Sequence, residues 1–139
     1  MNGVRFALDS TTAVYCLNNI PGVLERYHAE IIVALPAATV GELLFGAMKS
    51  KLRTDNLERY ERFIENAIVL PIDMETCRHY AEIKLNLERA GTPIPVNDMW
   101  IAASCLRHGL TLAADDGHYD NVAGLPVENW YPRKPPKSR

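Results

Sequence analysis

The sequence predicts an α/β domain in which helices cover both faces of a central parallel sheet of four to five strands. Short apolar runs alternate with longer helical segments along the chain, and this alternation is typical of a parallel sheet. The chain of 139 residues has the length of one ordinary domain. A hydrophobic content of 47% with 23% charged residues is typical of a globular protein and excludes a disordered chain.

The first half of the chain predicts two strands and four helices. The strands, at residues 4–8 and 31–35, are short apolar runs, and Pro36 ends the second one. Thr39 and, three residues later, Glu42 match a capping box, which predicts that a helix begins at Thr39. The four helices predicted here cover residues 13–17, 23–28, 39–48 and 54–66.

The second half predicts three strands and two longer helices. A helical pattern at residues 73–90 is closed by Gly91. Two prolines at 93 and 95 cannot lie inside a helix, and Asn97 and Asp98 behind them are good helix caps. The last helix is therefore predicted to begin at Asp98 and to end at His108. The strands predicted here cover residues 68–72 and 110–114, with a short one at 127–130.

We expect one domain over residues 1–131, followed by a basic, proline-rich tail over residues 132–139 that is disordered. No apolar run approaches the roughly 20 residues of a membrane helix, and the N-terminus lacks an export signal. Three isolated cysteines favour reduced thiols in the cytoplasm. The net charge of −2 gives no overall attraction to nucleic acid, so an RNA partner needs a local basic patch or a bound metal.

Acidic residues gather at one edge of the predicted sheet. Asp9, Asp115 and Asp116 come directly after strands, while Glu42 and Asp98 lie in the first turns of helices. Because ligands of a parallel sheet bind outside the carboxyl ends of the strands, these side chains are expected to meet. Each also has a local explanation as a cap or turn residue, and capping does not exclude a second role.

Gathered carboxylates repel one another, and a divalent cation removes that penalty. Mg²⁺ takes oxygen ligands and leaves room for water and phosphate oxygens, so it can activate water for attack on a phosphodiester. The sequence offers no competing chemistry. Its four histidines are scattered, His118 has no predicted role, and neither a nucleophile elbow nor a phosphate-binding glycine loop is present.

From the first strand to Trp130, the chain resembles the PIN-domain ribonucleases of the VapC toxin group. The four acidic positions of this family are matched by Asp9, Glu42, Asp98 and Asp116. The motifs around them also match, in the segments 38–46, 91–98, 110–112 and 127–130. The resemblance implies a PIN-like three-layer domain and an endoribonuclease that depends on Mg²⁺ or Mn²⁺ and hydrolyses RNA by metal-activated water, leaving a 5′-phosphate.

The resemblance also implies roles and partners. Asp9, Asp98 and Asp116 would bind the metal, Glu42 would complete the site or activate the water, and Asp115 is an accessory candidate. The protein would be the cytoplasmic, usually dimeric toxin of a type II toxin–antitoxin system. Such toxins cut translation-related RNA, often tRNA, and are neutralised by a cognate antitoxin.

Two motifs depart from the family pattern. The first motif is commonly Asp-Thr-Asn, whereas residues 9–11 read Asp-Ser-Thr. The last is usually Thr-Asn-Asp, whereas residues 114–116 read Ala-Asp-Asp, which removes a hydroxyl and adds a charge. These changes bear on the number of metal ions and on the rate more than on the fold.

Other readings stay open from the sequence alone. A DNA-directed nuclease would use the same metal site. A catalytically silent module would act only by binding an antitoxin-like partner. For the cognate antitoxin itself, the resemblance implies a helix that lies in an apolar groove of the early helices and places an arginine or lysine in the acidic site. A phosphoacceptor domain is disfavoured because it needs a second aspartate two residues after Asp9, where the chain has Thr11.

Several residues outside the acidic set also have two readings. Lys49, Lys51 and Arg53 follow the helix of Glu42, and they form either a solvated face or phosphate contacts near the site. The basic tail is either solvated or an arm for RNA. Trp100 is expected to pack, although an exposed indole would stack a base. Gly46, one turn beyond Glu42, indicates a close approach of another backbone.

Overall fold

Five parallel strands form one sheet in the order β3-β2-β1-β4-β5. The structure is a computed structural model that describes residues 3–132. The strands are β1 (Val4–Leu8), β2 (Ile32–Pro36), β3 (Ile68–Leu70), β4 (Thr111–Ala113) and β5 (Val127–Glu128). The predicted α/β class and strand number are confirmed. The tail predicted to be disordered covers residues 132–139. Of these, residues 133–139 lie outside the described part.

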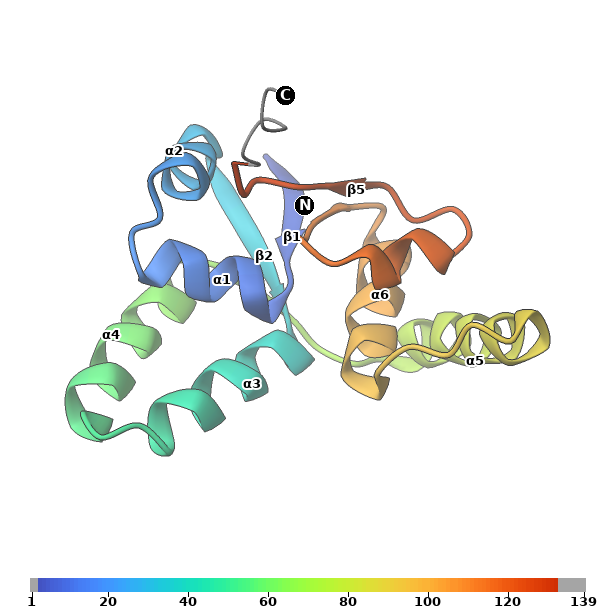
Figure 1. The fold of residues 1–139 in the computed structure, drawn as a ribbon, viewed down its shortest axis with the longest axis horizontal. Helices are drawn as coiled ribbons and strands as arrows, with labels where there is room; N and C mark the ends of the chain where they lie inside the picture. Colours follow the sequence, from blue (N-terminus) through green and yellow to red (C-terminus); the bar gives the residue numbers. More distant parts are fainter. Residues whose placement is uncertain (1–2, 133–139) are drawn as a thin grey trace, which may run out of the picture.

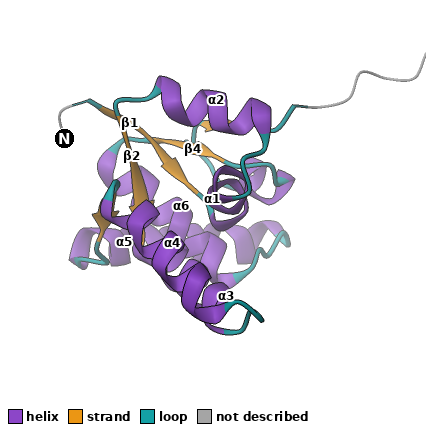
Figure 2. Cartoon of the chain, turned by 90° about the vertical axis from the view of Figure 1, so that its left-hand side faces the viewer, coloured by secondary structure: helices purple, strands orange, loops and turns teal. Residues whose placement is uncertain are grey.

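Helices connect the strands and cover both faces of the sheet. They are α1 (Ser10–Leu17), α2 (Pro21–Ala29), α3 (Ala37–Met48), α4 (Arg53–Glu65), α5 (Met74–Ala90) and α6 (Val96–His108), with a 3₁₀ helix η1 (Gly117–Asn121). Figure 1 shows α1 to α4 on one side of the strands and α5 and α6 on the other. In Figure 2, α3 and α4 lie in front, with α5 and α6 behind. Among residues 3–132, no helix has the length and apolar character needed to cross a membrane.

The hydrophobic core has one layer on each face of the sheet, because successive side chains of a strand point to opposite faces. Phe6 and Leu8 of β1 pack in the layer that contains Leu43 of α3. Ala7, between them in sequence, packs in the layer that contains Ile101 of α6. With both faces covered, the carboxyl ends of the strands remain the edge at which a ligand can bind.

Helices α1 to α4 and α6 begin one to three residues earlier than the sequence predicts, and two of these starts follow a proline directly. α3 begins at Ala37, directly after Pro36, and α6 begins at Val96, directly after Pro95. Both prolines have nearly the same extended backbone, with φ −56° and ψ 148° at Pro36 and φ −55° and ψ 145° at Pro95. Neither helix has a side-chain cap, so the predictions that Thr39 with Glu42 forms a capping box and that Asn97 or Asp98 caps α6 are wrong. These polar residues lie inside the helices instead, where their side chains are free for tertiary contacts.

Thr39 uses this freedom to tie α3 to the sheet. Its hydroxyl is fully buried and donates a hydrogen bond of 2.9 Å to the backbone oxygen of Leu8, at the end of β1. Asp9, the residue after Leu8, begins α1. The contact therefore fixes the start of α3 against the end of β1, next to Asp9.

A second polar contact joins α5 to α6. Asp73 caps α5, because its Oδ1 accepts hydrogen bonds from the backbone N–H of Thr76 at 2.9 Å and from the Thr76 hydroxyl at 2.8 Å. Nε of Arg107, in the last turn of α6, lies 3.2 Å from Oδ2 of Asp73. These bonds lower the pKa of Asp73 to about 2, chiefly through the Thr76 N–H.

We expect Thr39→Val to lower the free energy of unfolding by about 1–3 kcal/mol, because valine keeps the shape but leaves the buried Leu8 oxygen without this donor. Urea denaturation followed by circular dichroism measures the change. Thr39→Ser retains the hydroxyl and is the matched control. Equal losses in the two variants would contradict the assigned role of the hydroxyl.

Asp73→Ala should destabilise the protein at neutral pH and matter progressively less in acid. The pKa of Asp73 is lower in the folded chain than its ordinary value of 3.8, so its stabilising effect is present above about pH 4 and is lost as the pH falls through about 2. Melting temperatures of wild type and variant, measured from pH 7 to pH 2, should converge at the acid end. A constant difference over this range would show that the carboxylate charge is not involved.

Candidate metal centre

Asp9 is the buried member of the acidic edge. It links β1 to α1, and its Oδ1 caps α1 by accepting a hydrogen bond of 2.8 Å from the backbone N–H of Thr12. Only 4% of the residue is exposed. Burial chiefly, and to a lesser extent the negative charges of Asp98 and Asp116, raises the pKa of Asp9 to about 6 against the lowering effect of the Thr12 hydrogen bonds. The predicted cap is confirmed, and Asp9 lies close enough to Asp98 and Asp116 to interact with their charges.

Asp98, Asp116 and His118 form a tight group beside Asp9. One side-chain ligand atom from each of the three lies within 4.8 Å of the others. Nδ1 of His118 lies 3.3 Å from Oδ2 of Asp98 and 3.1 Å from Oδ2 of Asp116. Asp98 comes from the first turn of α6, while Asp116 caps η1 through the backbone N–H of His118 at 2.9 Å.

Glu42 joins this edge through Asn97. The side-chain amide of Asn97 donates a hydrogen bond to Oε1 of Glu42, which connects the middle of α3 to the first turn of α6. Asn97 directly precedes Asp98, so the bond places Glu42 next to the Asp98 turn. Glu42 is not part of the three-residue group itself. The predicted residues Asp9, Asp98 and Asp116 thus come together, and Glu42 borders them.

Asp115 points to a different set of partners. Its Oδ1 accepts a hydrogen bond of 2.7 Å from the side-chain amide of Asn129, and the Tyr15 hydroxyl donates to its Oδ2 at 3.3 Å. Oδ1 of Asn129 accepts in turn from the backbone N–H of Tyr131 at 2.8 Å, and the Tyr131 ring lies 4.7 Å from the Tyr15 ring. The carboxylate of Asp115 therefore holds the loop of Asp116 to α1 and to the segment after β5.

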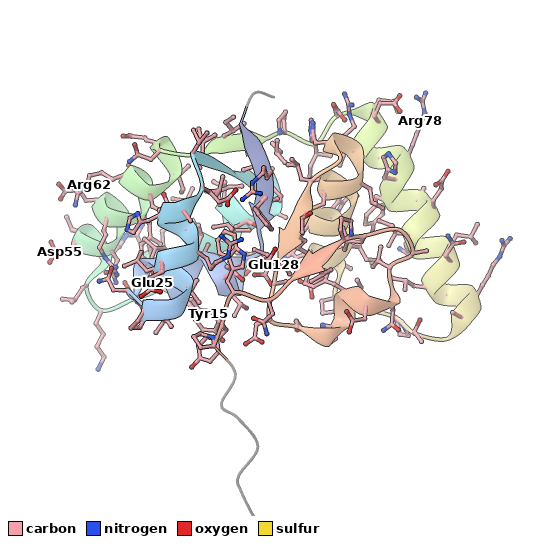
Figure 3. The ribbon with its side chains drawn as sticks, turned by 90° about the horizontal axis from the view of Figure 1, so that it is seen from above. Tyr15, Glu25, Asp55, Arg62, Arg78 and Glu128 are labelled. Atoms are coloured by element: carbon pink, nitrogen blue, oxygen red, sulfur yellow. The ribbon has the colours of Figure 1, made fainter. Side chains whose placement is uncertain are left out.

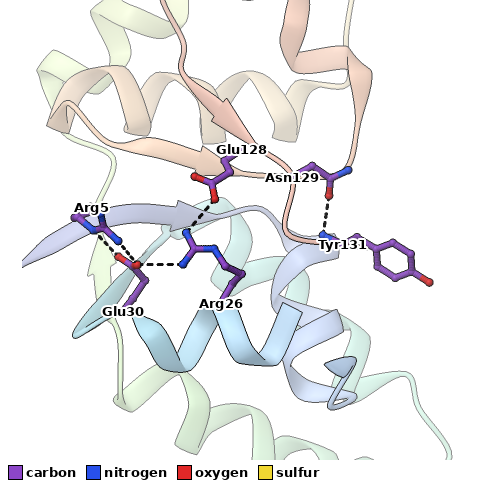
Figure 4. Close-up of polar contacts among 6 residues, drawn as sticks. All are labelled: Arg5, Arg26, Glu30, Glu128, Asn129 and Tyr131. Carbon is purple, nitrogen blue, oxygen red and sulfur yellow. Dashed lines mark hydrogen bonds and ion pairs between the residues drawn. The ribbon is translucent and has the colours of Figure 1, made fainter. Parts of the chain in front are cut away.

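An ion-pair network anchors that segment on its other side. Glu128 receives a hydrogen bond of 3.0 Å from Nη2 of Arg26 on α2, and Nη1 of Arg26 lies 3.6 Å from Glu30 (Figure 4). The Glu30 side chain is only 1% exposed and is also bonded by Arg5 of β1, which lowers the pKa of Glu30. The buried Trp130 packs edge-on against Phe6 of the same strand. Figure 3 shows Glu128 near the middle of the molecule, between the two groups of helices, and Tyr15 at its lower edge.

Sequence reasoning missed His118. The signal was its position two residues after Asp116, where a turn brings both side chains to one point, but a lone histidine without ligand spacing gave no reason to assign it. The expected packing of Trp100 is confirmed, because its ring stacks on Tyr80 at 3.8 Å with an interplanar angle of 11°. Trp100 is therefore engaged within the protein.

The donor set fits a small divalent cation. Among residues 3–132, no lysine or arginine forms an ion pair with Asp9, Glu42, Asp98 or Asp116, and His118 is the neighbour able to carry positive charge. A carboxylate with a pKa raised by burial and by like charges gains most from a bound cation. Carboxylate oxygens suit Mg²⁺ and Mn²⁺, and an added imidazole nitrogen suits Mn²⁺ better than Mg²⁺.

Two ribonucleases are similar to the chain over nearly their whole length. The chain is 29% identical over 130 residues to the tRNA(fMet)-specific endonuclease VapC of Salmonella typhimurium, covering 91% of this chain and 98% of the relative. It is 28% identical, with the same coverage, to ribonuclease VapC2 of Haemophilus influenzae.

Solved structures show the same fold. DNA-bound VapBC from Salmonella typhimurium matches with a TM-score of 0.85 at 29% identity, and VapBC-1 from nontypeable Haemophilus influenzae matches with a TM-score of 0.83 at 25% identity. In both comparisons 91% of this chain and 98% of the matched chain are covered. The family model of the PIN domain matches residues 7–125, which include β2, β3, β4, the acidic edge and His118. The chain belongs to the PIN domain family.

Proposed function

We propose that the chain is the toxin of a type II toxin–antitoxin system and hydrolyses RNA phosphodiester bonds as a metal-dependent endoribonuclease. The observation that carries this proposal is the group of Asp98, Asp116 and His118 beside buried Asp9, which no lysine or arginine of the described residues neutralises. Similarity to VapC endonucleases over nearly their whole length supports the ribonuclease chemistry and favours tRNA or another translation-related RNA as substrate.

Asp9, Asp98 and Asp116 are the proposed metal ligands, with His118 as a further donor. When bound, Mg²⁺ or Mn²⁺ supplies a Lewis acid that polarises the phosphodiester and activates a water. The chain's own residues hold this arrangement. The Thr12 N–H fixes Asp9, and Asn97 fixes Glu42 at the rim of the site, where its carboxylate can orient the attacking water and accept its proton.

A cognate antitoxin is the proposed protein partner. The matched structures of Salmonella typhimurium and Haemophilus influenzae are VapBC proteins, and this supports a two-protein toxin–antitoxin complex here. We further propose a homodimer and action in the cytoplasm. The cysteines of the described residues are all free thiols, which is compatible with a reducing compartment.

Asp98→Asn should reduce RNA cleavage at least about 100-fold while the protein stays folded. Asparagine keeps the shape but removes a ligand charge, and loss of even the hydrogen bonds around metal ligands lowers activity about 10–100-fold. Cleaved RNA ends, mapped after expression of each protein in cells, measure the effect. Asp120→Asn, the same change in exposed Asp120 of η1, is the matched control. Full activity of Asp98→Asn, or no uptake of Mn²⁺ by wild type in calorimetry, would contradict the proposal.

Asp115→Asn and Asp116→Asn should differ in RNA cleavage and in Mn²⁺ affinity, although the two residues are neighbours in sequence. Asp115 is held by Tyr15 and Asn129, so its loss of charge should leave cleavage within about tenfold of wild type. Asp116→Asn should reduce cleavage and Mn²⁺ affinity as severely as Asp98→Asn. The two affinities, measured by calorimetry, and the two rates decide the matter. An equal loss of Mn²⁺ binding in both variants would make Asp115 a ligand.

A further inference from the structure

An exposed row of side chains leads along α3 away from the acidic edge. Glu42, Phe45 and Lys49 are spaced at i, i+3 and i+7, so they share one face of the helix. From Glu42 to Lys49 the rise is about 10 Å. Phe45 is 60% exposed and belongs to neither core layer. A large aromatic ring on the solvent side, one turn from a proposed catalytic carboxylate, is not explained by the packing of the domain.

We propose that this row, here called the α3 track, binds single-stranded RNA next to the cleavage site. The track consists of Phe45 and Lys49, continued by Lys51 in the turn after α3 and by Arg53, the first residue of α4. Phe45 would stack one base, and the cations would contact the phosphates beside it. The inference rests on the proposed ribonuclease function and adds to it the surface that holds the substrate.

The Phe45 and Lys49 side chains are arranged for this task. Nζ of Lys49 lies 4.9 Å from the centroid of the Phe45 ring, so the ring and the charge form one unit on the surface. Proteins that bind single strands combine aromatic rings, on which bases stack, with cations along the backbone. Because every base has a stacking face, such a unit holds RNA without requiring a particular sequence.

Gly46 provides an independent observation on the same face. Apart from its two chain neighbours and the adjoining backbone of α3, a Cβ added at Gly46 would meet no atom of the described residues within 4 Å. The close backbone approach that the sequence indicated at Gly46 is thus absent from the described part of the chain. Glycine destabilises a helix relative to alanine, and no contact in the described residues offsets this. A backbone lying between Phe45 and Lys49, as bound RNA would, makes use of the missing side chain.

Charge favours RNA over a second copy of the chain as the occupant. From residue 49 to residue 55 there are three cations and one acid, Asp55, which points outward from α4 in Figure 3. This is a local basic patch of the kind that an overall charge of −2 makes necessary. A two-fold dimer centred on this face would bring the same cations of both copies together, where they would repel.

Binding of a short fluorescein-labelled, single-stranded RNA to the full chain tests the proposal. Anisotropy is measured with Mg²⁺ in the Asp98→Asn background, which prevents cleavage. Adding Phe45→Ala should weaken binding about 5- to 100-fold, the value of one stacked base, and Phe45→Trp should restore it. The plot of log affinity against log salt has a negative slope, and Lys49→Gln should make it shallower by about 0.7 because one phosphate contact is lost. Lys84→Gln, which removes a similar cation 5.9 Å from the Tyr80 ring on α5, is the matched control.

The outcomes separate this inference from the proposed function. Unchanged RNA binding in Phe45→Ala would overturn the α3 track, while loss of cleavage in Asp98→Asn alone would still support the ribonuclease. If Lys84→Gln weakened RNA binding as much as Lys49→Gln does, this would also overturn the α3 track. If light scattering shows that Phe45→Ala only dissociates a dimer, and RNA binding returns at higher protein concentration, the face is an interface between copies. In the active chain, Phe45→Ala should raise KM with little change in kcat, and a fall in kcat alone would contradict the binding role.

Discussion

The hydrogen bond from the Thr12 N–H to Asp9 is the contact on which the acidic edge depends. Asp9 directly follows the central strand β1 and caps α1, and its backbone N–H donates to the Ala113 oxygen at the end of β4, 3.3 Å away. Since Asp116 follows Ala113 by three residues, the pairing of β1 with β4 brings the two aspartates to the same edge. The cap hydrogen bond from Thr12 favours the charged form of Asp9, although burial opposes its charge.

Two prolines extend this arrangement to the helices. Pro36 and Pro95 have the same extended backbone, and each is followed at once by a helix without a side-chain cap. The polar residues of the first turns are then available for contacts between elements. Thr39 bonds to β1, and Asn97 bonds to Glu42. The acidic edge is thus held by side chains that an ordinary helix start would have used for capping.

The alternation of apolar strands and amphipathic helices was enough to predict the fold, because each element buries a face with its own period. The meeting of Asp9 and Asp116 was predictable for a related reason, because the carboxyl ends of parallel strands lie at one edge of the sheet. Contacts between elements were not predictable. The local sequence around Thr39 is compatible both with a capping box and with a hydrogen bond to the sheet. The acceptor that Thr39 uses, the Leu8 oxygen, is 31 residues away in sequence, so local patterns do not reveal it. His118 and Asn97 acquire partners only when η1, α3 and α6 meet.

The charges of the molecule are divided in a way that a metal-dependent reaction on RNA requires. If a lysine stood beside Asp98 and Asp116, it would pair with them and compete with the cation for the same oxygens. The first cation of the α3 track, Lys49, lies instead at the far end of the helix, a rise of about 10 Å along its axis from Glu42. That is close to the Debye length of about 8 Å at physiological ionic strength. At this separation the basic patch can attract phosphates while salt screens it from the carboxylates, so one small domain can hold both charges without neutralising its own site.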